Sequence, residues 1–183
     1  MKIIAGRFKS RVMKMPEGIR PTSDKVRGAF FEILKDRIEG ANFLDLYCGS
    51  GAIGIEAFSR GAKAISFVDN NFQCIRALKK NLALLGISDL SSIEIYNKDV
   101  PRALREFYAK SLSFDIVFLD PPYRKELAKN TLIAISDCDI LARNVIIVVE
   151  AYKKESLPDA AGMLKKVRTY RYGDTKLEFY YKK

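Results

Sequence analysis

Short apolar runs alternate with amphipathic segments of helical period over most of the chain. The apolar runs predict strands at residues 43–47, 64–69, 93–96, 114–119 and 145–150. The segments between them predict helices at residues 52–59, 71–85, 101–109 and 125–136. Two further strands, at residues 168–172 and 176–181, flank Gly173-Asp174, which is a hairpin signal. This alternation predicts an α/β fold with a seven-stranded, mostly parallel sheet that carries helices on both faces.

The N-terminal part of the chain precedes this alternation and predicts a different feature. Residues 2–5 and 11–14 have the pattern of two short strands around the basic turn Arg7-Phe8-Lys9-Ser10. We therefore expect an N-terminal β-hairpin. A helix then opens within Thr22-Ser23-Asp24, whose side chains are all suited to capping it, and runs to about residue 37.

The length and composition indicate one domain. The sequence contains no repeat, low-complexity tract or linker, so we expect a single domain over residues 1–183. Residues 1–20 would form the basic hairpin extension, and residues 21–183 the main body. No stretch has the length and apolarity of a transmembrane helix or signal peptide, which favours a cytoplasmic protein.

The net charge of +10 is concentrated at the two ends of the chain. Residues 1–27 hold eight basic against two acidic residues, and residues 152–183 hold nine against four. Basic ends on a nearly neutral middle indicate a polyanionic partner, most simply nucleic acid, although a solvated surface is the alternative. The candidate phosphate contacts are Arg7, Lys9, Arg11, Arg20, Lys25 and Arg27. Of these, Arg20 and Arg27 could instead pair with nearby acids in a structural role.

The absence of histidine excludes several kinds of chemistry. Ser-His-Asp and Cys-His nucleophile pairs and histidine-based metal sites cannot be built from this chain. The three cysteines are scattered, so neither a disulfide framework nor a zinc site is expected. Any general base must be a carboxylate or water.

One segment combines a strand end, a glycine-rich loop and a helix start. The segment is Leu44-Asp45-Leu46-Tyr47-Cys48-Gly49-Ser50-Gly51-Ala52-Ile53-Gly54. Gly49 and Gly51 let the backbone turn sharply near a ligand, and Gly54 permits tight helix packing. Asp69 ends the next predicted strand, twenty residues after Gly49, where a carboxylate can accept hydrogen bonds from ribose hydroxyls. The segment therefore predicts a cofactor site.

Two cofactors fit this arrangement, a nicotinamide dinucleotide and S-adenosylmethionine. Asp45 could face the cationic amino-acid end of S-adenosylmethionine but would be a poor neighbour for a pyrophosphate, so we expect S-adenosylmethionine. Asp99 follows the third strand and could receive an adenine amine or cap the next helix. The expected cofactor contacts are Asp45, Tyr47, Cys48, Gly49, Ser50, Gly51, Asp69, Asn70, Asp99, Val100 and Asp120.

The candidate catalytic residues are Asp120, Pro121, Pro122 and Tyr123, which follow the fourth strand. The two prolines have no N–H, so the chain must leave the sheet at the edge where open α/β sheets bind ligands. The Asp120 carboxylate and the Pro121 carbonyl can accept both hydrogens of an exocyclic amine, while Tyr123 stacks on a planar base. The alternative is a tight strand-to-helix connection with an N-capping acid.

The glycine loop, Asp69, Asp99 and Asp120-Pro121-Pro122-Tyr123 together resemble the Rossmann-like class I S-adenosylmethionine-dependent methyltransferases that act on amines. Two N-terminal stretches, residues 6–11 and Arg20-Pro21-Thr22-Ser23-Asp24-Lys25-Val26-Arg27, are similar to the bacterial RsmD family. The likeness covers essentially the whole chain. Ser10 replaces a glycine that is usual in this family's basic turn, which concerns only the conformation of the hairpin.

This resemblance implies methylation of a guanine N2 amine in 16S rRNA by a cytoplasmic monomer that needs neither metal nor membrane. The partner would be the small ribosomal subunit or an assembly intermediate. An adenine-N6 methyltransferase is the nearest rival, but the chain has no spare segment for a target-recognition insert. The basic ends of the chain suit an RNA substrate better than the protein substrate of a glutamine-N5 methyltransferase. A catalytically inactive RNA-binding module is disfavoured by the intact glycine loop and turn.

Overall fold

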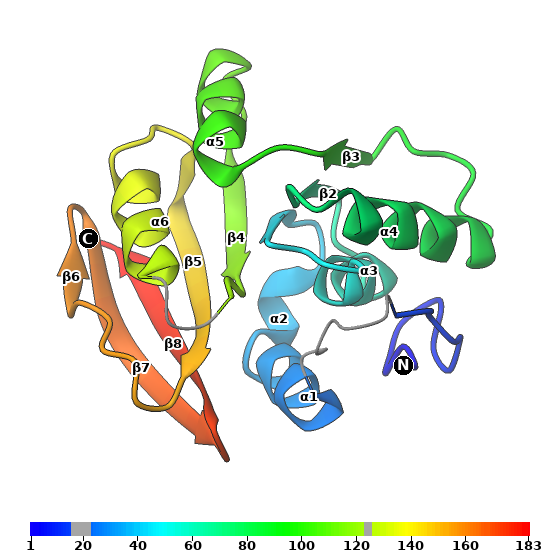
Figure 1. Cartoon of the computed structure of the whole chain (residues 1–183), viewed down its shortest axis with the longest axis horizontal. Coiled ribbons are helices and arrows are strands. Elements are labelled where there is room, and N and C mark those ends of the chain that lie inside the picture. Colours follow the sequence, from blue (N-terminus) through cyan, green and yellow to red (C-terminus); the bar gives the residue numbers. More distant parts are fainter. Residues whose placement is uncertain (16–22, 123–125) are drawn as a thin grey trace.

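All the strands that the structure describes join one sheet, shown in Figure 1. The computed structural model describes residues 1–15, 23–122 and 126–183. The strands are β1 (Asn42–Leu46), β2 (Ala64–Val68), β3 (Ile93–Tyr96), β4 (Phe114–Leu119), β5 (Leu141–Tyr152), β6 (Ala160–Ala161), β7 (Leu164–Tyr172) and β8 (Thr175–Lys182). Their order is β3-β2-β1-β4-β5-β8-β7-β6. The first five strands of that order pair in parallel, and the remaining pairings are antiparallel.

Helices cover both faces of the sheet. They are α1 (Asp24–Ile33), α2 (Lys35–Ile38), α3 (Ala52–Ser59), α4 (Phe72–Leu84), α5 (Val100–Ala109) and α6 (Leu127–Ser136). Alternate strand residues point to opposite faces, which divides the core in two. Phe43, Phe67 and Phe118 pack with α1 to α4 on one face, whereas Leu44 and Val117 pack with α5 and α6 on the other. No described helix is long and apolar enough to cross a membrane.

The α/β fold with helices on both faces is confirmed, but the described sheet has eight strands rather than seven. The additional strand is β6, which pairs with β7 at the edge of the sheet. Its two residues are too few to produce a periodic pattern in the sequence. The helix expected to reach residue 37 is also divided, because Leu34 leaves helical geometry at φ −98° and ψ 3°.

The predicted N-terminal hairpin is present in a shorter form. In the N-terminal loop, residues 1–15, the two segments pair antiparallel through the Lys2–Val12 bridge, with hydrogen bonds from the Ile3 N–H to the Arg11 carbonyl at 3.0 Å and from the Met13 N–H to the Met1 carbonyl at 2.8 Å. Beyond Ile3 the first segment turns to α3, where the Glu56 carboxylate accepts the backbone N–H groups of Ile4 and Ala5 at 2.8 and 2.9 Å.

Glu56 is therefore the anchor of the N-terminal loop. Its side chain is fully buried, and it also accepts a hydrogen bond from Arg60 Nε at 2.8 Å. An ionised carboxylate with three donors is well satisfied in this position. Removing it would leave two backbone N–H groups and one guanidinium without their acceptor.

We expect Glu56→Ala to lower the free energy of unfolding by about 3–5 kcal/mol, because it breaks a buried, hydrogen-bonded ion pair. Urea denaturation followed by circular dichroism measures this. The control is Glu32→Ala, an exposed α1 carboxylate 3.8 Å from Lys35, whose removal should change the value by less than about 0.5 kcal/mol. Similar losses in the two variants would contradict the anchoring role.

Candidate functional site

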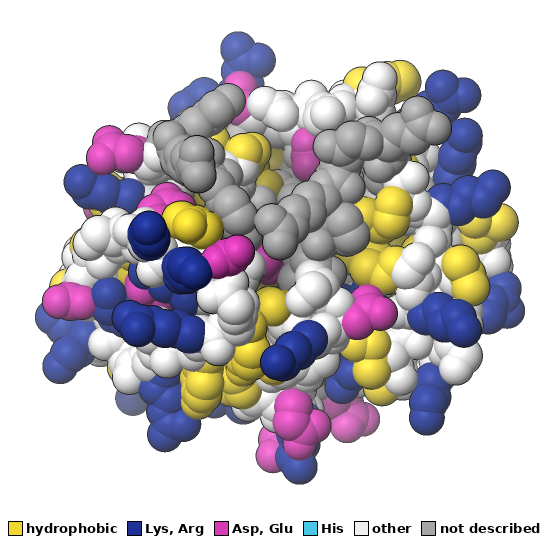
Figure 2. All heavy atoms as spheres, turned by 60° about the horizontal axis from the view of Figure 1, so that its bottom comes forward, with side chains coloured by type: hydrophobic (Ala, Val, Ile, Leu, Met, Phe, Trp, Pro, Cys, Tyr) yellow, Lys and Arg dark blue, Asp and Glu magenta, His cyan; other side chains and the backbone are white. Residues whose placement is uncertain are grey.

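The strand order reverses between β1 and β4, which are neighbours in the sheet. Open α/β sheets bind ligands at such a point, outside the carboxyl ends of the strands. The structure has a cavity of about 700 Å³ here, lined from the loops after β1, β2 and β4, the end of β5 and the β7–β8 hairpin. Figure 2 shows the face toward which the β4 and β5 arrows point in Figure 1. Acidic side chains lie near its middle, and many basic side chains lie toward its outside.

The glycine loop after β1 is held by the carboxylate of Asp69. Asp69 Oδ2 accepts the N–H of Gly49 at 2.9 Å, and its Oδ1 accepts the N–H of Asn71 at 2.8 Å. Gly49 has φ +54°, and among the described residues none other than its two chain neighbours lies within 4 Å of the position that a Cβ would take. A side chain there would extend into open space at the site. The loop therefore leaves room for a ligand beside its own backbone.

Asp45 lies beneath this loop and is almost completely buried. Its Oδ2 accepts the N–H of Gly54 at 2.9 Å. Gly54 packs so closely on β2 that a Cβ would lie 2.3 Å from the Phe67 ring, which agrees with the expected tight helix packing. Burial raises the pKa of Asp45 to about 8, the Gly54 N–H opposes this, and the charges of Asp120 and Asp69 add to it. A neighbouring cation would favour the ionised form.

Two further loop residues line the cavity with distinct chemistry. The Tyr47 backbone is left-handed at φ +60°, and its hydroxyl shares a 2.7 Å hydrogen bond with Thr131 Oγ1 on α6. This bond ties the loop after β1 to the helix that follows the β4 turn. Cys48 is buried, and burial raises the pKa of its thiol well above the ordinary value. The thiol is therefore a packing group rather than a nucleophile.

The turn after β4 reaches the same cavity. Asp120 donates its N–H to the Leu46 carbonyl at 3.4 Å, which continues the pairing of β4 with β1. Asp120, Pro121 and Pro122 all line the cavity. Tyr123 lies outside the described residues. The candidate catalytic carboxylate and the glycine loop thus border one space.

Asp99 caps the helix that follows it, which is one of its two expected roles. It is the N-cap of α5, where its Oδ1 accepts the N–H of Arg102 at 2.9 Å. Asp99 and the buried Val100 are not among the residues that line the cavity. The structure therefore shows the helix-capping role of Asp99, and the cofactor contact of Asp99 and Val100 stays a prediction.

The cavity brings together most of the other predicted cofactor residues. It is lined by Asp45, Tyr47, Cys48, Gly49, Ser50, Asp69, Asn70 and Asp120. Gly51 does not line it. A Cβ at Gly51 would lie 2.3 Å from Leu78 Cδ1, so this glycine serves the packing of α3 on α4.

Comparison with known proteins places this chain in a family. The family model described as "Conserved hypothetical protein 95" matches residues 1–181. Ribosomal RNA small subunit methyltransferase D of Haemophilus influenzae is 35% identical, over 92% of this chain and 89% of that protein. YlbH of Bacillus subtilis is 36% identical over the full length of both chains. The chain belongs to the RsmD family.

The fold of this RsmD-family chain also agrees with a solved structure of a relative. The structure of Escherichia coli yhhF matches with a TM-score of 0.85 and 30% identity, over 100% of this chain and 98% of that one. The agreement extends from the N-terminal loop to the terminal hairpin. The resemblance inferred from the sequence motifs is thereby confirmed.

The basic residues of the N-terminal region separate into two groups. Lys9 and Lys25 are exposed, as is Arg11, whose guanidinium donates to the Leu84 carbonyl at 2.8 Å. Arg27 is fully buried, so its expected contact with phosphate is wrong. Its guanidinium bonds the Lys2 carbonyl and Asp24, which fastens α1 to the N-terminal loop. Arg20 lies outside the described residues.

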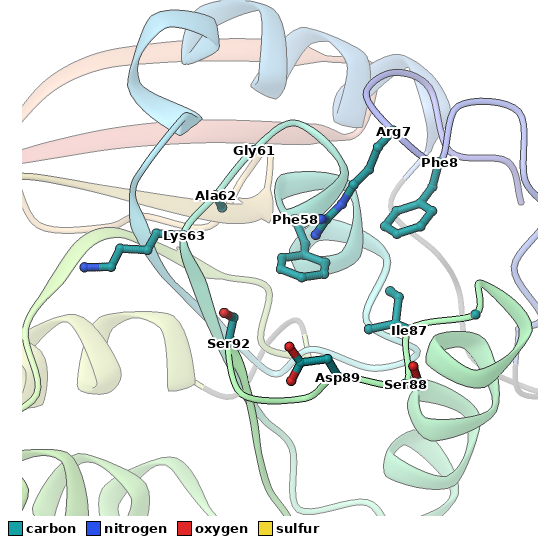
Figure 3. Close-up of a pocket in the computed structure, with 11 residues that line it drawn as sticks. Arg7, Phe8, Phe58, Gly61, Ala62, Lys63, Ile87, Ser88, Asp89 and Ser92 are labelled. Atoms are coloured by element: carbon teal, nitrogen blue, oxygen red, sulfur yellow. The ribbon is translucent and has the colours of Figure 1, made fainter.

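Arg7 occupies a second hollow, shown in Figure 3. Its guanidinium carbon lies 3.8 Å from the centre of the Phe58 ring and 5.0 Å from that of Phe8. This hollow of about 480 Å³ borders the segments that precede β2 and β3. It therefore lies at the amino edge of the strands, separated from the glycine loop by α3. The eight residues of α3 correspond to a length of about 12 Å.

Several cavity residues were not predicted from the sequence. They include Met15, Ser23, Glu150, Tyr172, Asp174 and Thr175. Glu150 had a usable signal, because it is an acid at the end of a buried β-branched run, just as Asp120 follows the run in β4. The others come from distant segments that approach only in the folded chain.

The raised pKa of Asp45 predicts a pH dependence of stability. An aspartate in the unfolded chain titrates near pH 3.9, so between about pH 4 and 8 the folded chain binds a proton that the unfolded chain lacks. The free energy of unfolding should therefore decrease as the pH rises through this range. The contribution reaches about 1.4 kcal/mol per pH unit.

Urea denaturation between about pH 5.5 and 7.5 measures this slope. Asp45→Asn should remove the contribution, because the amide keeps an acceptor for Gly54 but does not titrate. Asp36→Asn, at an exposed position on α2, is the matched control and should keep the slope of the unmodified protein. Parallel pH profiles for the unmodified protein and Asp45→Asn would contradict the assignment.

Proposed function

We propose that this protein is an S-adenosylmethionine-dependent methyltransferase that methylates the N2 amine of a guanine in 16S rRNA. The observation that carries the proposal is the shared cavity. The Asp120-Pro121-Pro122 turn and the glycine loop border it from adjacent strands. An amine held by the first can therefore meet a methyl donor held by the second.

The residues at the glycine loop fit S-adenosylmethionine. The backbone at Gly49 leaves open space, and Asp69 retains acceptor capacity for ribose hydroxyls beyond its two backbone donors. Asp45 supplies a buried carboxyl group whose ionised form suits the cationic amino-acid end of this cofactor. Bound there, the cofactor supplies a methyl group on a positively charged sulfur, which becomes a neutral thioether as the C–S bond breaks and the N–C bond forms.

The turn after β4 prepares the amine for this transfer. The lone pair of an aryl amine is delocalised into its ring, which makes the nitrogen a weak nucleophile. Hydrogen bonds from the amine to the Asp120 carboxylate and the Pro121 carbonyl shift electron density to nitrogen and fix its direction. The proton displaced from nitrogen passes to Asp120 or to water. In the proposal Tyr123 stacks on the base, which contributes about 1–3 kcal/mol.

The assignment of 16S rRNA as the substrate rests on the family relationship. The Haemophilus influenzae and Escherichia coli relatives, 35% and 34% identical, are both named Ribosomal RNA small subunit methyltransferase D. The same names support the small ribosomal subunit or an assembly intermediate as the partner and the cytoplasm as the location. We infer that residues 1–183 act as a single domain, because all described strands join one sheet. We also propose that the protein is a monomer.

The proposal predicts a specific change in modified nucleosides. Mass spectrometry of 16S rRNA from cells that lack the protein should show the loss of one N2-methylguanosine. The unmodified gene should restore it, as should the control Asp139→Ala at an exposed position before β5. Asp120→Ala should not, because removing a group that stabilises the transition state typically costs about 10²–10³-fold in rate.

Two outcomes would contradict this prediction in different ways. The Asp120 carboxylate and the Pro121 carbonyl, which hold the amine in this proposal, form the amine cradle. Restoration of N2-methylguanosine by Asp120→Ala would remove the amine cradle from the mechanism. Loss of N6-methyladenosine instead would make adenine the substrate. Calorimetric titration with S-adenosylmethionine shows whether Asp120→Ala still binds the cofactor, as the proposal requires.

The proposal also assigns phosphate contacts to the exposed basic residues near the N-terminus. Each such contact contributes about 0.7–0.9 to the slope of log K against log salt concentration. The double variant Lys9→Gln, Lys25→Gln should therefore bind 16S rRNA more weakly, with a slope shallower by about 1.4–1.8. Filter binding over a salt series measures this. Lys129→Gln on α6 is the control, and an unchanged slope in the double variant would leave these lysines as ordinary surface.

A further inference from the structure

A second buried carboxylate borders the site beside Asp120. Glu150 lies near the end of β5, is only 4% exposed and lines the same cavity as Asp120, Pro121 and the glycine loop. The amine cradle described above makes no use of it. An ionised carboxylate has about four acceptor positions, so Glu150 can accept a further donor from a bound substrate in addition to its partners in the protein. Its position relative to Asp120 indicates which donor that is.

The strand register places Glu150 next to Asp120 on the same face of the sheet. β4 pairs with β5 in parallel, with Phe118 opposite Val148 and Leu119 opposite Val149. Continuing this register by one residue sets Asp120 beside Glu150. Phe118 and Val148 both belong to the core on the α1 face, so side chains two residues further on point to that face as well. Adjacent strands lie about 4.7–4.9 Å apart, which is the spacing expected between these two backbones.

Guanine presents two neighbouring donors at the edge that the proposed reaction uses. Its N1 carries a hydrogen, and its C2 carries the amine that becomes methylated. Adenine has its amine beside an N1 that carries a lone pair and accepts hydrogen bonds. Two side-by-side carboxylates therefore suit the guanine edge and repel the adenine edge.

We propose that Glu150 accepts the N1–H of the target guanine while Asp120 and the Pro121 carbonyl hold its N2 amine. This inference rests on the proposed function and deepens it, because it assigns the choice of guanine over adenine to a named residue. The Asp-Pro-Pro turn by itself suits either amine. Glu150 is in this sense a specificity-determining residue of the site.

Neither carboxylate is without a partner in the protein. This is compatible with the proposal, because an ionised carboxylate has about four acceptor positions. The N1–H of the base is an additional donor to a carboxylate that already has partners in the protein. An adenine in the same place would bring its N1 lone pair against the Glu150 carboxylate. Both groups are acceptors, so no hydrogen bond could form between them.

The test changes the group that Glu150 is proposed to contact. 2,6-Diaminopurine keeps the N2 amine of guanine but has a lone pair at N1 and an amine in place of the C6 carbonyl, so the comparison of Glu150→Gln with its control isolates the contact at N1. The substrates are small subunits rebuilt with 16S rRNA that carries guanine or 2,6-diaminopurine at the methylated nucleotide. The unmodified enzyme should prefer guanine by at least about tenfold in kcat/KM, the effect of one charge-assisted hydrogen bond.

Glu150→Gln should reduce this preference to nearly one, because an amide can either accept from N1–H or donate to an N1 lone pair. The matched control is Asp174→Asn. Asp174 also lines the cavity, but it lies in the hairpin between β7 and β8 and pairs with Lys153 at 2.5 Å. This control should keep the preference for guanine.

A purely structural role for Glu150 would give a different result. Glu150→Gln would then lower kcat/KM for both substrates by the same factor and keep the preference, which would overturn the proposal. Should the variant fail to fold, the unmodified protein with S-adenosylhomocysteine decides the matter. Equal affinity for the two subunits would overturn the proposal, and tighter binding of guanine would support it. If the unmodified enzyme transferred no methyl group to guanine N2, the proposed function itself would fail.

Discussion

The pairing of β1 with β4 is the constraint on which the site depends. Leu46 lies opposite Leu119, and the Asp120 N–H continues the ladder to the Leu46 carbonyl. The loops that follow the two strands therefore leave the sheet side by side. A register slip of one residue would turn every side chain to the other face. The glycine loop and the Asp120 turn would then no longer border one cavity.

The charged groups that line this cavity are acidic, whereas the outer surface of the molecule is mainly basic. Asp45, Asp69, Asp120 and Glu150 line a space that favours hydrogen-bond donors and cations, whereas most of the described basic side chains lie on the surface. A nucleic acid presents both kinds of group, namely anionic phosphates and donor-bearing base edges. The cavity is therefore suited to an extruded base and a cationic cofactor, and the surface to the backbone around it.

Local patterns predicted the elements that are regular and buried. The helix at Ala52–Ser59 and the strands at Ile93–Tyr96 and Phe114–Leu119 have the predicted bounds, because glycine, proline or polar turn residues flank each of them in the sequence. The glycine loop and the Asp120 turn were also predicted, because their glycine and proline residues directly follow strand runs in the sequence. The N-terminal hairpin is shorter than predicted because Glu56, distant in sequence, binds the backbone of Ile4 and Ala5, and Arg27 was misassigned because burial is a property of the fold. The β7–β8 hairpin was predicted from Gly173-Asp174, but no local pattern indicates the long-range pairing of β8 with β5 that brings Thr175 and Tyr172 to the cavity.

The most direct test of the central claim is a crystal structure with S-adenosylhomocysteine and an RNA fragment that contains the target guanine. We predict that the sulfur lies beside Gly49 and that the guanine N2 is bound by Asp120 and Pro121. The gap between sulfur and N2 should be one that a single methyl group bridges, because reacting atoms must approach to about 3–3.5 Å. Density for the base elsewhere, or an Asp120 side chain turned away from it, would contradict the account.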